Sequence, residues 1–315
     1  MAFETFGFKK ITHDGALWYK PHPAISSDPT ITRNPTPTAG VYGCYALAHV
    51  NDCLIVGTAD EVRAVKDYLG TKFKIKDLGD VSVFTGLLIQ RNRSCRTLQI
   101  SQGHCARQLI ETYGMQNCNP VLTPMDTKDV ELNFGKCTEE DRTLSQSMVG
   151  SLMYLAGATH PDISYTMTRL AQFASNPSEK HLVAIKRVLR YIKGAPDASL
   201  QLATTDSPLI SYFDSSWLDN LTDRRSTYGL AVLWDVSPIL RKSKKHSMVI
   251  MLTCESEYLA GTKLIRELCW IRNILMGLNQ LLYLGITKTQ MGSWQLQCNI
   301  GHDTLKQDSL ILQRK

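Results

Sequence analysis

The sequence predicts an α+β protein in which strand-rich and helical segments alternate along the chain. Three observations favour this class: residues 41–57 are rich in strand-forming residues, residues 144–192 carry three successive helical patterns, and three short apolar runs after residue 208 precede one long helix. Strands followed by a helix indicate a separate α/β unit, so we expect a domain boundary between residues 194 and 208.

The composition is that of an ordinary folded chain of 315 residues, 43% hydrophobic and 20% charged. The formal net charge of +6 is compatible with polyanion binding but does not demonstrate it. Nine dispersed cysteines without a C-x-x-C pair indicate no zinc knuckle or disulfide framework and favour an intracellular location, in the cytoplasm or nucleus. We see no secretory signal, and the polar residues in the apolar run 268–286 favour a buried amphipathic helix over a membrane span.

The first part of the chain predicts a loop, a hairpin and a helix. Residues 21–39 hold five prolines, which indicates a loop or linker. The tripeptide "VND" at residues 50–52 is placed where a tight turn would join two strands. Thr58 and Glu61 have the spacing of a capping box, in which each side chain bonds the backbone N–H of the other, and the helix that follows is expected to end at Gly70.

The remaining elements follow from periodicity and from glycine and proline positions. We expect, in order, a hairpin closed near 93–95, helices at 102–113, 144–158, 161–174 and 178–192, strands at 208–217, 224–234 and 249–253, and a helix at 255–278. Past residue 277 the sequence shows no sustained hydrophobic period of either a helix or a strand. The helix at 178–192 has an apolar side and a largely basic side with Lys186, Arg187, Arg190 and Lys193, and both a solvated face and a nucleic-acid contact remain open.

Acidic residues at three positions could carry metal-dependent chemistry. Two Mg²⁺ ions about 3.5–4 Å apart need anionic bridging oxygens, and a carboxylate pair at a hairpin turn supplies them. Here the turn holds Asp52 beside Asn51, whose neutral amide cannot offset the charge of a second metal ion, and Asn-Asp is also ordinary turn chemistry. Asp214 in a predicted strand and Glu257 near a predicted helix start could form half of a hydrolytic metal site, although Asp214 could simply end its strand.

The order of these motifs resembles the Pol polyprotein of copia-type long-terminal-repeat retrotransposons. The segments "FGFKKITHDGALWYK", "HVNDCLIVG", "KDLGDVSVFTGLLI" and "LQISQGHCARQLIETYGM" are similar to its reverse transcriptase motifs. "VGSLMYLAGATHPDISYTMTRLAQFASNPSEKHLVAIKRVLRYIKGA" matches nearly every anchor of the next family segment, and "DRRSTYG" and "SKKHSMVIMLTCESEYLA" resemble its RNase H motifs. The resemblance covers roughly residues 3–280 and is collinear.

The resemblance implies a fold and a domain order. It implies a partial reverse transcriptase palm at 1–95, a mostly helical thumb or connection at 96–200, an incomplete α/β RNase H-like domain at 205–280, and a degenerate tail at 281–315. Its activities are RNA-directed DNA polymerase and ribonuclease H. It also implies Mg²⁺ as cofactor, RNA, DNA or RNA:DNA hybrids as partners, deoxynucleoside triphosphates as polymerase substrates, and no membrane or other small-molecule cofactor.

Carried over position by position, the resemblance assigns roles to five residues. Asp52 matches the second aspartate of the polymerase pair and Asn51 replaces the first, while a third palm carboxylate is expected upstream of this chain. Asp214 matches the RNase H strand aspartate and Glu257 its helix glutamate, so that Asp52, Asp214 and Glu257 are the candidate catalytic residues and metal ligands. The family's third RNase H acid has no counterpart at Cys298-Asn299, where Asp303 is the nearest substitute.

Three functional hypotheses follow from these residues. The leading one is a truncated, degenerate reverse transcriptase and RNase H in which both metal sites are incomplete and catalysis is lost. The second is a non-catalytic nucleic-acid-binding protein that uses Lys186, Arg187, Arg190, Lys193, Arg241, Lys242, Lys244 and Lys245. The third is a residual Mg²⁺-dependent nuclease built on Asp214, Glu257 and Asp303.

Overall fold

The computed structural model describes most of the chain in eight segments. They are residues 2–21, 43–126, 137–203, 209–216, 223–234, 236–278, 283–288 and 294–299. Nearly all of the expected proline-rich linker, and Asp303, lie outside the described residues. The chain divides into two compact units, one formed by Met1–Lys76, Cys269–Leu284 and Cys298–Lys315, the other by Asp77–Leu268 and Gly285–Gln297.

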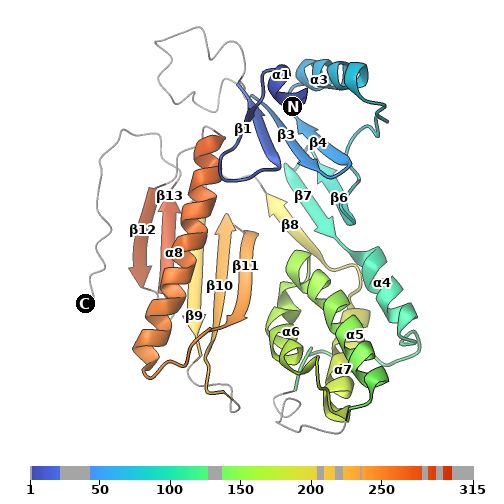
Figure 1. Ribbon diagram of the computed structural model, residues 1–315, viewed down its shortest axis with the longest axis vertical. Coiled ribbons are helices and arrows are strands. Elements are labelled where there is room, and N and C mark those ends of the chain that lie inside the picture. Colours follow the sequence, from blue (N-terminus) through green and yellow to red (C-terminus); the bar gives the residue numbers. More distant parts are fainter. Residues whose placement is uncertain are drawn as a thin grey trace. The chain divides into compact units, whose positions relative to one another are not determined.

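The first unit contains an antiparallel sheet with helices packed on one face (Figure 1). Its elements are α1 (Ala2–Thr5), β1 (Lys9–Lys10), β2 (Leu17–Lys20), β3 (Cys44–His49), β4 (Asp52–Val56) and α3 (Ala59–Lys72), with the strands in the order β1-β2-β3-β4. The buried cluster consists of Phe8, Trp18, Cys44, Ala46, Val65 and Leu69. The predicted capping box is confirmed, because Thr58 N–H donates to Glu61 Oε2 (3.0 Å) and Glu61 N–H donates to Thr58 Oγ1 (3.4 Å).

The second unit begins with a small sheet and a helical cluster. The sheet has the order β5-β6-β7-β8, with β5 (Val83–Phe84), β6 (Leu87–Asn92), β7 (Thr97–Ser101) and β8 (Ser199–Ala203). The helical elements are α4 (Gly103–Thr112), α5 (Glu139–Ala158), η2 (Pro161–Ile163), α6 (Ser164–Leu170), η3 (Ala171–Phe173) and α7 (Glu179–Gly194). Their apolar faces share one buried cluster that includes Met148, Leu152, Ile185 and Leu189.

The same unit contains a five-stranded sheet and most of a long helix. The strands are β9 (Leu209–Ser215), β10 (Thr227–Trp234), β11 (Ser237–Lys245), β12 (Tyr283–Lys288) and β13 (Trp294–Asn299), in the order β11-β10-β9-β13-β12. The helix α8 (Thr253–Gly277) follows β11 and buries Ala260, Leu264 and Leu268. The predicted α+β class is confirmed by these antiparallel sheets and helices.

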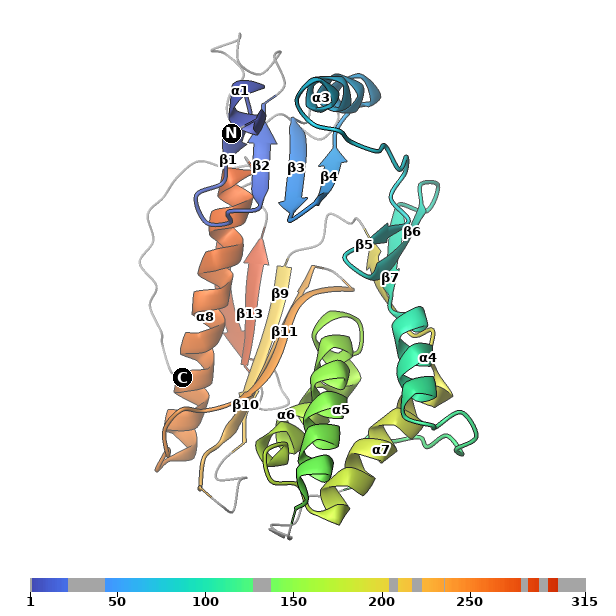
Figure 2. The same ribbon diagram turned by 45° about the vertical axis from the view of Figure 1, so that its right-hand side comes forward.

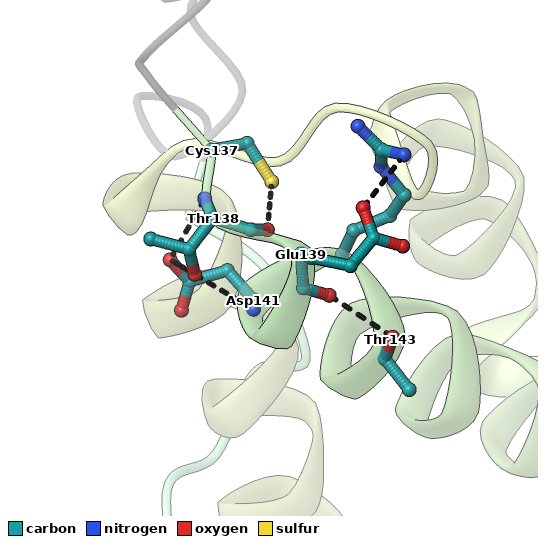
Figure 3. Close-up of polar contacts among 6 residues, drawn as sticks. Cys137, Thr138, Glu139, Asp141 and Thr143 are labelled. Carbon is teal, nitrogen blue, oxygen red and sulfur yellow. Dashed lines mark hydrogen bonds and ion pairs between the residues drawn. The ribbon is translucent and has the colours of Figure 1, made fainter.

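Helix α5 begins five residues before the predicted start at residue 144. Thr138 and Asp141 form a second capping box, in which Asp141 N–H donates to Thr138 Oγ1 (3.1 Å) and Thr138 N–H donates to Asp141 Oδ2 (3.4 Å) (Figure 3). In the same turn Thr143 Oγ1 donates to the carbonyl oxygen of Glu139 (2.9 Å). The signal is present in the sequence as a threonine three residues before an acidic residue.

The predicted third strand at 249–253 is wrong. The strand lies at β11, and the segment between β11 and α8 has no regular structure, with Met251 and Leu252 exposed and Ile250 buried. Periodicity missed β11 because its sequence, SPILRKSKK, is basic on both faces, whereas its pairing with β10 from Trp234–Ser237 to Thr227–Lys245 fixes it as a strand. Strands β12 and β13, in the segment without a period, were also not predicted.

The residues of the expected domain boundary contain a strand. β8 pairs with β7 from Thr97–Ala203 to Ser101–Ser199, and Ala203 N–H donates to Ser237 Oγ (2.8 Å) at the start of β11. Among the described residues no helix is long and apolar enough to cross a bilayer.

Candidate functional site

The β3–β4 hairpin places Asn51 and Asp52 at an exposed tip. His49 pairs with Asp52 across the strands, so Val50 and Asn51 form the two-residue turn that the sequence predicted. Val50 has φ 51° and is 91% exposed. A β-branched residue in the left-handed region costs about 1–3 kcal/mol, so the turn is locally strained.

The donor groups at this tip do not fit a two-metal centre. Asp52 supplies the one carboxylate of the turn, and the neighbouring Asn51 supplies a neutral amide. Because Mg²⁺ is bound through hard anionic oxygens, this tip cannot provide the charge that two ions require. Across the described ranges, no group of three or more His, Cys, Asp and Glu side chains is arranged to hold a metal ion.

Strand β9 directs Asp214 away from α8. A Cβ atom placed on Gly261 of α8 would lie 3.1 Å from the ring of Phe213, and Ser215 Oγ lies 2.5 Å from Ser256 Oγ of α8. Successive side chains of a strand point to opposite faces, so Asp214, between Phe213 and Ser215, projects from the other face. Glu257 belongs to α8, which packs on the face of β9 opposite to the one from which Asp214 projects.

The edge strand β11, separated from β9 by β10, shows the same division of faces, and Figure 2 shows α8 on one side of this sheet and α5 and α6 on the other. Lys242 Nζ pairs with Glu267 of α8 at 2.6 Å. Arg241 donates to the carbonyl oxygen of Ala158 at the end of α5, and Thr168 Oγ1 of α6 donates to the carbonyl oxygen of Ser243 (2.9 Å). The face that carries Asp214 is therefore the one beside α5 and α6.

A hydrogen-bonded cluster that sequence reasoning missed lies beside the two acids. Ser215 Oγ lies 3.2 Å from His246 Nε2, and Ser256 Oγ donates to the carbonyl oxygen of Ser216 (3.2 Å). His246 is buried and its ring lies 4.8 Å from that of Tyr228. The available signal was that "SKKH" and "ESEY" depart from the S-K-K-Q and E-A-E-Y patterns of the resembled family at His246 and Ser256. The cluster ties the end of β9 to the first turns of α8.

Three of the four predicted nucleic-acid-binding residues on α7 bond a loop of the protein itself. Lys193 Nζ donates to the carbonyl oxygens of Gln116 (2.5 Å) and Cys118 (2.6 Å), and Arg190 Nε donates to that of Asn119 (2.7 Å). Arg187 donates through Nη2 to Thr123 Oγ1 (2.9 Å) and through Nε to its carbonyl oxygen (3.3 Å). Lys186 is exposed. The basic face of α7 thus holds residues 116–123 in place.

The predicted basic residues of β11 are divided in the same way. Lys245 Nζ pairs with Asp223 (2.7 Å) and donates to Gln172 Oε1 (2.9 Å), while Lys244 is exposed. Burial is the largest single influence on the pKa of Asp223 and acts to raise it, but the hydrogen bonds and positive charges of Lys245 and Arg225 together outweigh burial, and the pKa is lowered. Burial also lowers the pKa of Arg241. Of the eight predicted contacts, Lys186 and Lys244 are the two exposed ones.

Comparison with known proteins gives one family match and several curated relatives. Residues 37–127 match the family model described as reverse transcriptase (RNA-dependent DNA polymerase). The retrovirus-related Pol polyprotein from transposon TNT 1-94 of Nicotiana tabacum is 32% identical over 76% of this chain and 19% of its own length. That from transposon RE2 of Arabidopsis thaliana is 34% identical over 73% of this chain and 16% of its own length. The chain therefore spans less than a fifth of these two polyproteins.

A shorter relative is matched over almost its whole length. It is an uncharacterized mitochondrial protein of Arabidopsis thaliana, 33% identical over 72% of this chain and 93% of its own length. No solved structure gives a significant match.

Proposed function

The chain belongs to the reverse transcriptase family found in the Pol polyproteins of copia-type retrotransposons, and we propose that it is a degenerate member in which DNA synthesis has been lost. In this proposal residues 1–95 correspond to part of the palm, 96–200 to the thumb or connection, and 205–280 to an RNase H-like domain. The family usually uses a divalent metal ion, and its substrates are nucleic acids.

One observation carries the proposal: Asn51 and Asp52 share a hairpin tip that offers a single carboxylate. Phosphoryl transfer is catalysed mainly by metal positioning and charge stabilisation, so replacing a carboxylate by an amide removes most of the effect. For RNase H chemistry, support for inactivity comes from Asp214, which projects from the face of β9 opposite to the one on which α8, the helix of Glu257, packs.

Nucleic-acid binding without catalysis is the second candidate function. The exposed side chains of Lys186 and Lys244 favour it, because a phosphate backbone can reach them without displacing a contact within the protein. Arg187, Arg190 and Lys193 already donate to loop carbonyl oxygens, so fewer cations are available than the sequence suggested. We therefore expect weak binding with a shallow salt dependence, since the slope follows the number of phosphates neutralised.

The test is a pair of activity assays with a binding assay. The wild-type chain, Asp52→Asn, Asp214→Asn and the control Asp60→Asn, an exposed residue on α3, are given a primed template and an RNA:DNA hybrid with Mg²⁺ or Mn²⁺. We expect neither extension nor cleavage from any of the four. Cleavage abolished by Asp214→Asn and retained by Asp60→Asn would establish the residual nuclease and overturn the inactive assignment.

Binding is measured on the same hybrid by fluorescence anisotropy at about 50 and 200 mM salt. The second candidate predicts that Lys186→Ala and Lys244→Ala each reduce affinity and flatten the salt dependence. Unchanged affinity in both variants would contradict nucleic-acid binding through these two lysines, and with it the second candidate function.

A further inference from the structure

A groove of about 630 Å³ lies on the face of the five-stranded sheet that carries Asp214, beside the start of α6. Its lining includes Tyr165 of α6, Tyr212 and Asp214 of β9, Gly229 and Ala231 of β10, and Arg241 of β11. This volume lies in the range of small-molecule sites, about 300–1,000 Å³. Asp214 is the one candidate metal ligand among the lining residues, and the roles assigned above use neither the tyrosines nor the small residues of β10.

The floor of the groove is low because small residues occupy β10, the middle one of the three strands that line it. Gly229 pairs with Asp214 on one side and Ser243 on the other, and Ala231 pairs with Tyr212 and Arg241. A Cβ atom at Gly229 would meet nothing within 4 Å, so open space stands above the strand at this point. Larger side chains on β9 and β11 form the walls.

Two tyrosines and one carboxylate supply the chemistry of the groove. Tyr165 and Tyr212 are 45% and 38% exposed, so each presents part of a ring to the groove. Exposed aromatic rings on a sheet face are platforms on which nucleobases stack. Asp214 is exposed and, when ionised, only accepts hydrogen bonds. Arg241, on the far wall, donates to the carbonyl oxygens of Pro238 and Ala158.

We propose that this groove binds the guanine base of a nucleotide, with the ring stacked on Tyr212 or Tyr165 and its Watson–Crick edge on Asp214. Guanine presents two adjacent N–H donors, N1–H and the N2 amino group, that can bond both oxygens of one carboxylate. Adenine, cytosine and uracil each have a single donor group on that edge, next to an acceptor that would face and repel the second carboxylate oxygen. The site would require neither a metal ion nor the β3–β4 hairpin, so the proposal goes beyond the function proposed above.

The test compares four nucleoside monophosphates on the full chain, without divalent metal, by isothermal titration calorimetry. We expect GMP to bind about tenfold tighter than AMP, CMP or UMP, the difference made by one pair of charge-assisted hydrogen bonds. Asp214→Asn should abolish this preference. Tyr212→Ala and Tyr165→Ala should together weaken GMP binding by about tenfold or more, as expected for lost stacking.

Two further variants separate the groove from the rest of the surface. Gly229→Val fills the open space above β10 with a residue that favours strands, and it should abolish GMP binding while circular dichroism and the melting temperature stay as in the wild type. Tyr258→Ala removes a tyrosine that is 63% exposed on α8, and it should bind GMP as the wild type does. Equal affinity for the four nucleotides, or full GMP binding by folded Gly229→Val, would overturn the proposal. Hybrid cleavage by the wild type would overturn the proposed loss of catalysis but leave a guanine preference standing.

Discussion

Replacing Lys193 by alanine should destabilise the protein although the residue lies on a basic helix face. Lys193 Nζ donates to two carbonyl oxygens, at 2.5 Å from that of Gln116 and 2.6 Å from that of Cys118. A hydrogen bond from a charged donor contributes about 1.5–3 kcal/mol, and water can replace the exposed bond to Gln116 but less readily the half-buried bond to Cys118. We therefore expect Lys193→Ala to lower the free energy of unfolding by about 2 kcal/mol.

The assay is urea unfolding followed by circular dichroism, and the matched control is Lys186→Ala. Lys186 is exposed on the same helix, and substitutions at such sites change stability by about 0.5 kcal/mol or less. Both variants lose one positive charge, so their difference reports mainly the two carbonyl contacts, with a smaller contribution of about 0.3–1 kcal/mol from the position of Lys193 in the last turn of α7. If the two midpoints agree within error, the loop contacts of α7 do not stabilise the fold and the argument is refuted.

Three other substitutions test separate parts of the structure. Val50→Gly should raise the free energy of unfolding by about 1 kcal/mol, because glycine adopts positive φ without strain, and urea unfolding measures it. Leu152→Ala should lower it by about 2–5 kcal/mol, since Leu152 is 0% exposed in the helical core and a cavity remains. The hydrogen bond from Tyr191 to Asp162 raises the pKa of Tyr191 to about 12, so the stability that it contributes below its unfolded pKa near 10 is lost as the pH rises through 12. Tyr191→Phe should lack this loss in unfolding measured between pH 9 and pH 12.

Matched control substitutions show whether each stability change is specific to its site or is what any similar substitution in the same element would cause. Val56→Gly, in strand β4, should lower stability by about 0.5–1 kcal/mol, opposite in sign to Val50→Gly. Met153→Ala, next to Leu152 and 48% exposed, should change stability by about 0.5 kcal/mol or less. A destabilised Val50→Gly, a tolerated Leu152→Ala, or an alkaline loss in Tyr191→Phe equal to that of the wild type would each contradict the corresponding argument.

Local signals predicted most of the first half of the fold and the helices of the second unit. The Thr58 capping box, the turn at Val50 and Asn51, and the α7 helix begin where the sequence indicates, because these features depend on residues within one turn of each other. Strand β11 was not predicted because it depends on contacts between residues that are distant in the sequence. Its basic sequence carries no alternating apolar face, and only pairing with β10 and contacts to α6 and α8 make it a strand.

The candidate site was predictable in its residue types but not in its arrangement. Motif order located Asp52, Asp214 and Glu257, and the family it indicated is confirmed. Their roles as catalytic residues and metal ligands stay predictions. The Ser215, His246 and Ser256 cluster joins three segments distant in sequence, so the departures from the family pattern at His246 and Ser256 did not indicate that these side chains meet.

The sequence by itself determined the family and the presence of a neutral Asn51 beside Asp52, since both are matters of residue identity and order. Only the tertiary structure decided which face of the sheet Asp214 occupies and which groups the cations of α7 bond. The physical reason is the separation along the chain between the residues that interact. Helix periods and turn preferences act over a few residues, whereas the contacts of Arg190 and Lys193 with their loop span 71 to 77 residues of chain and exist only once the core has packed.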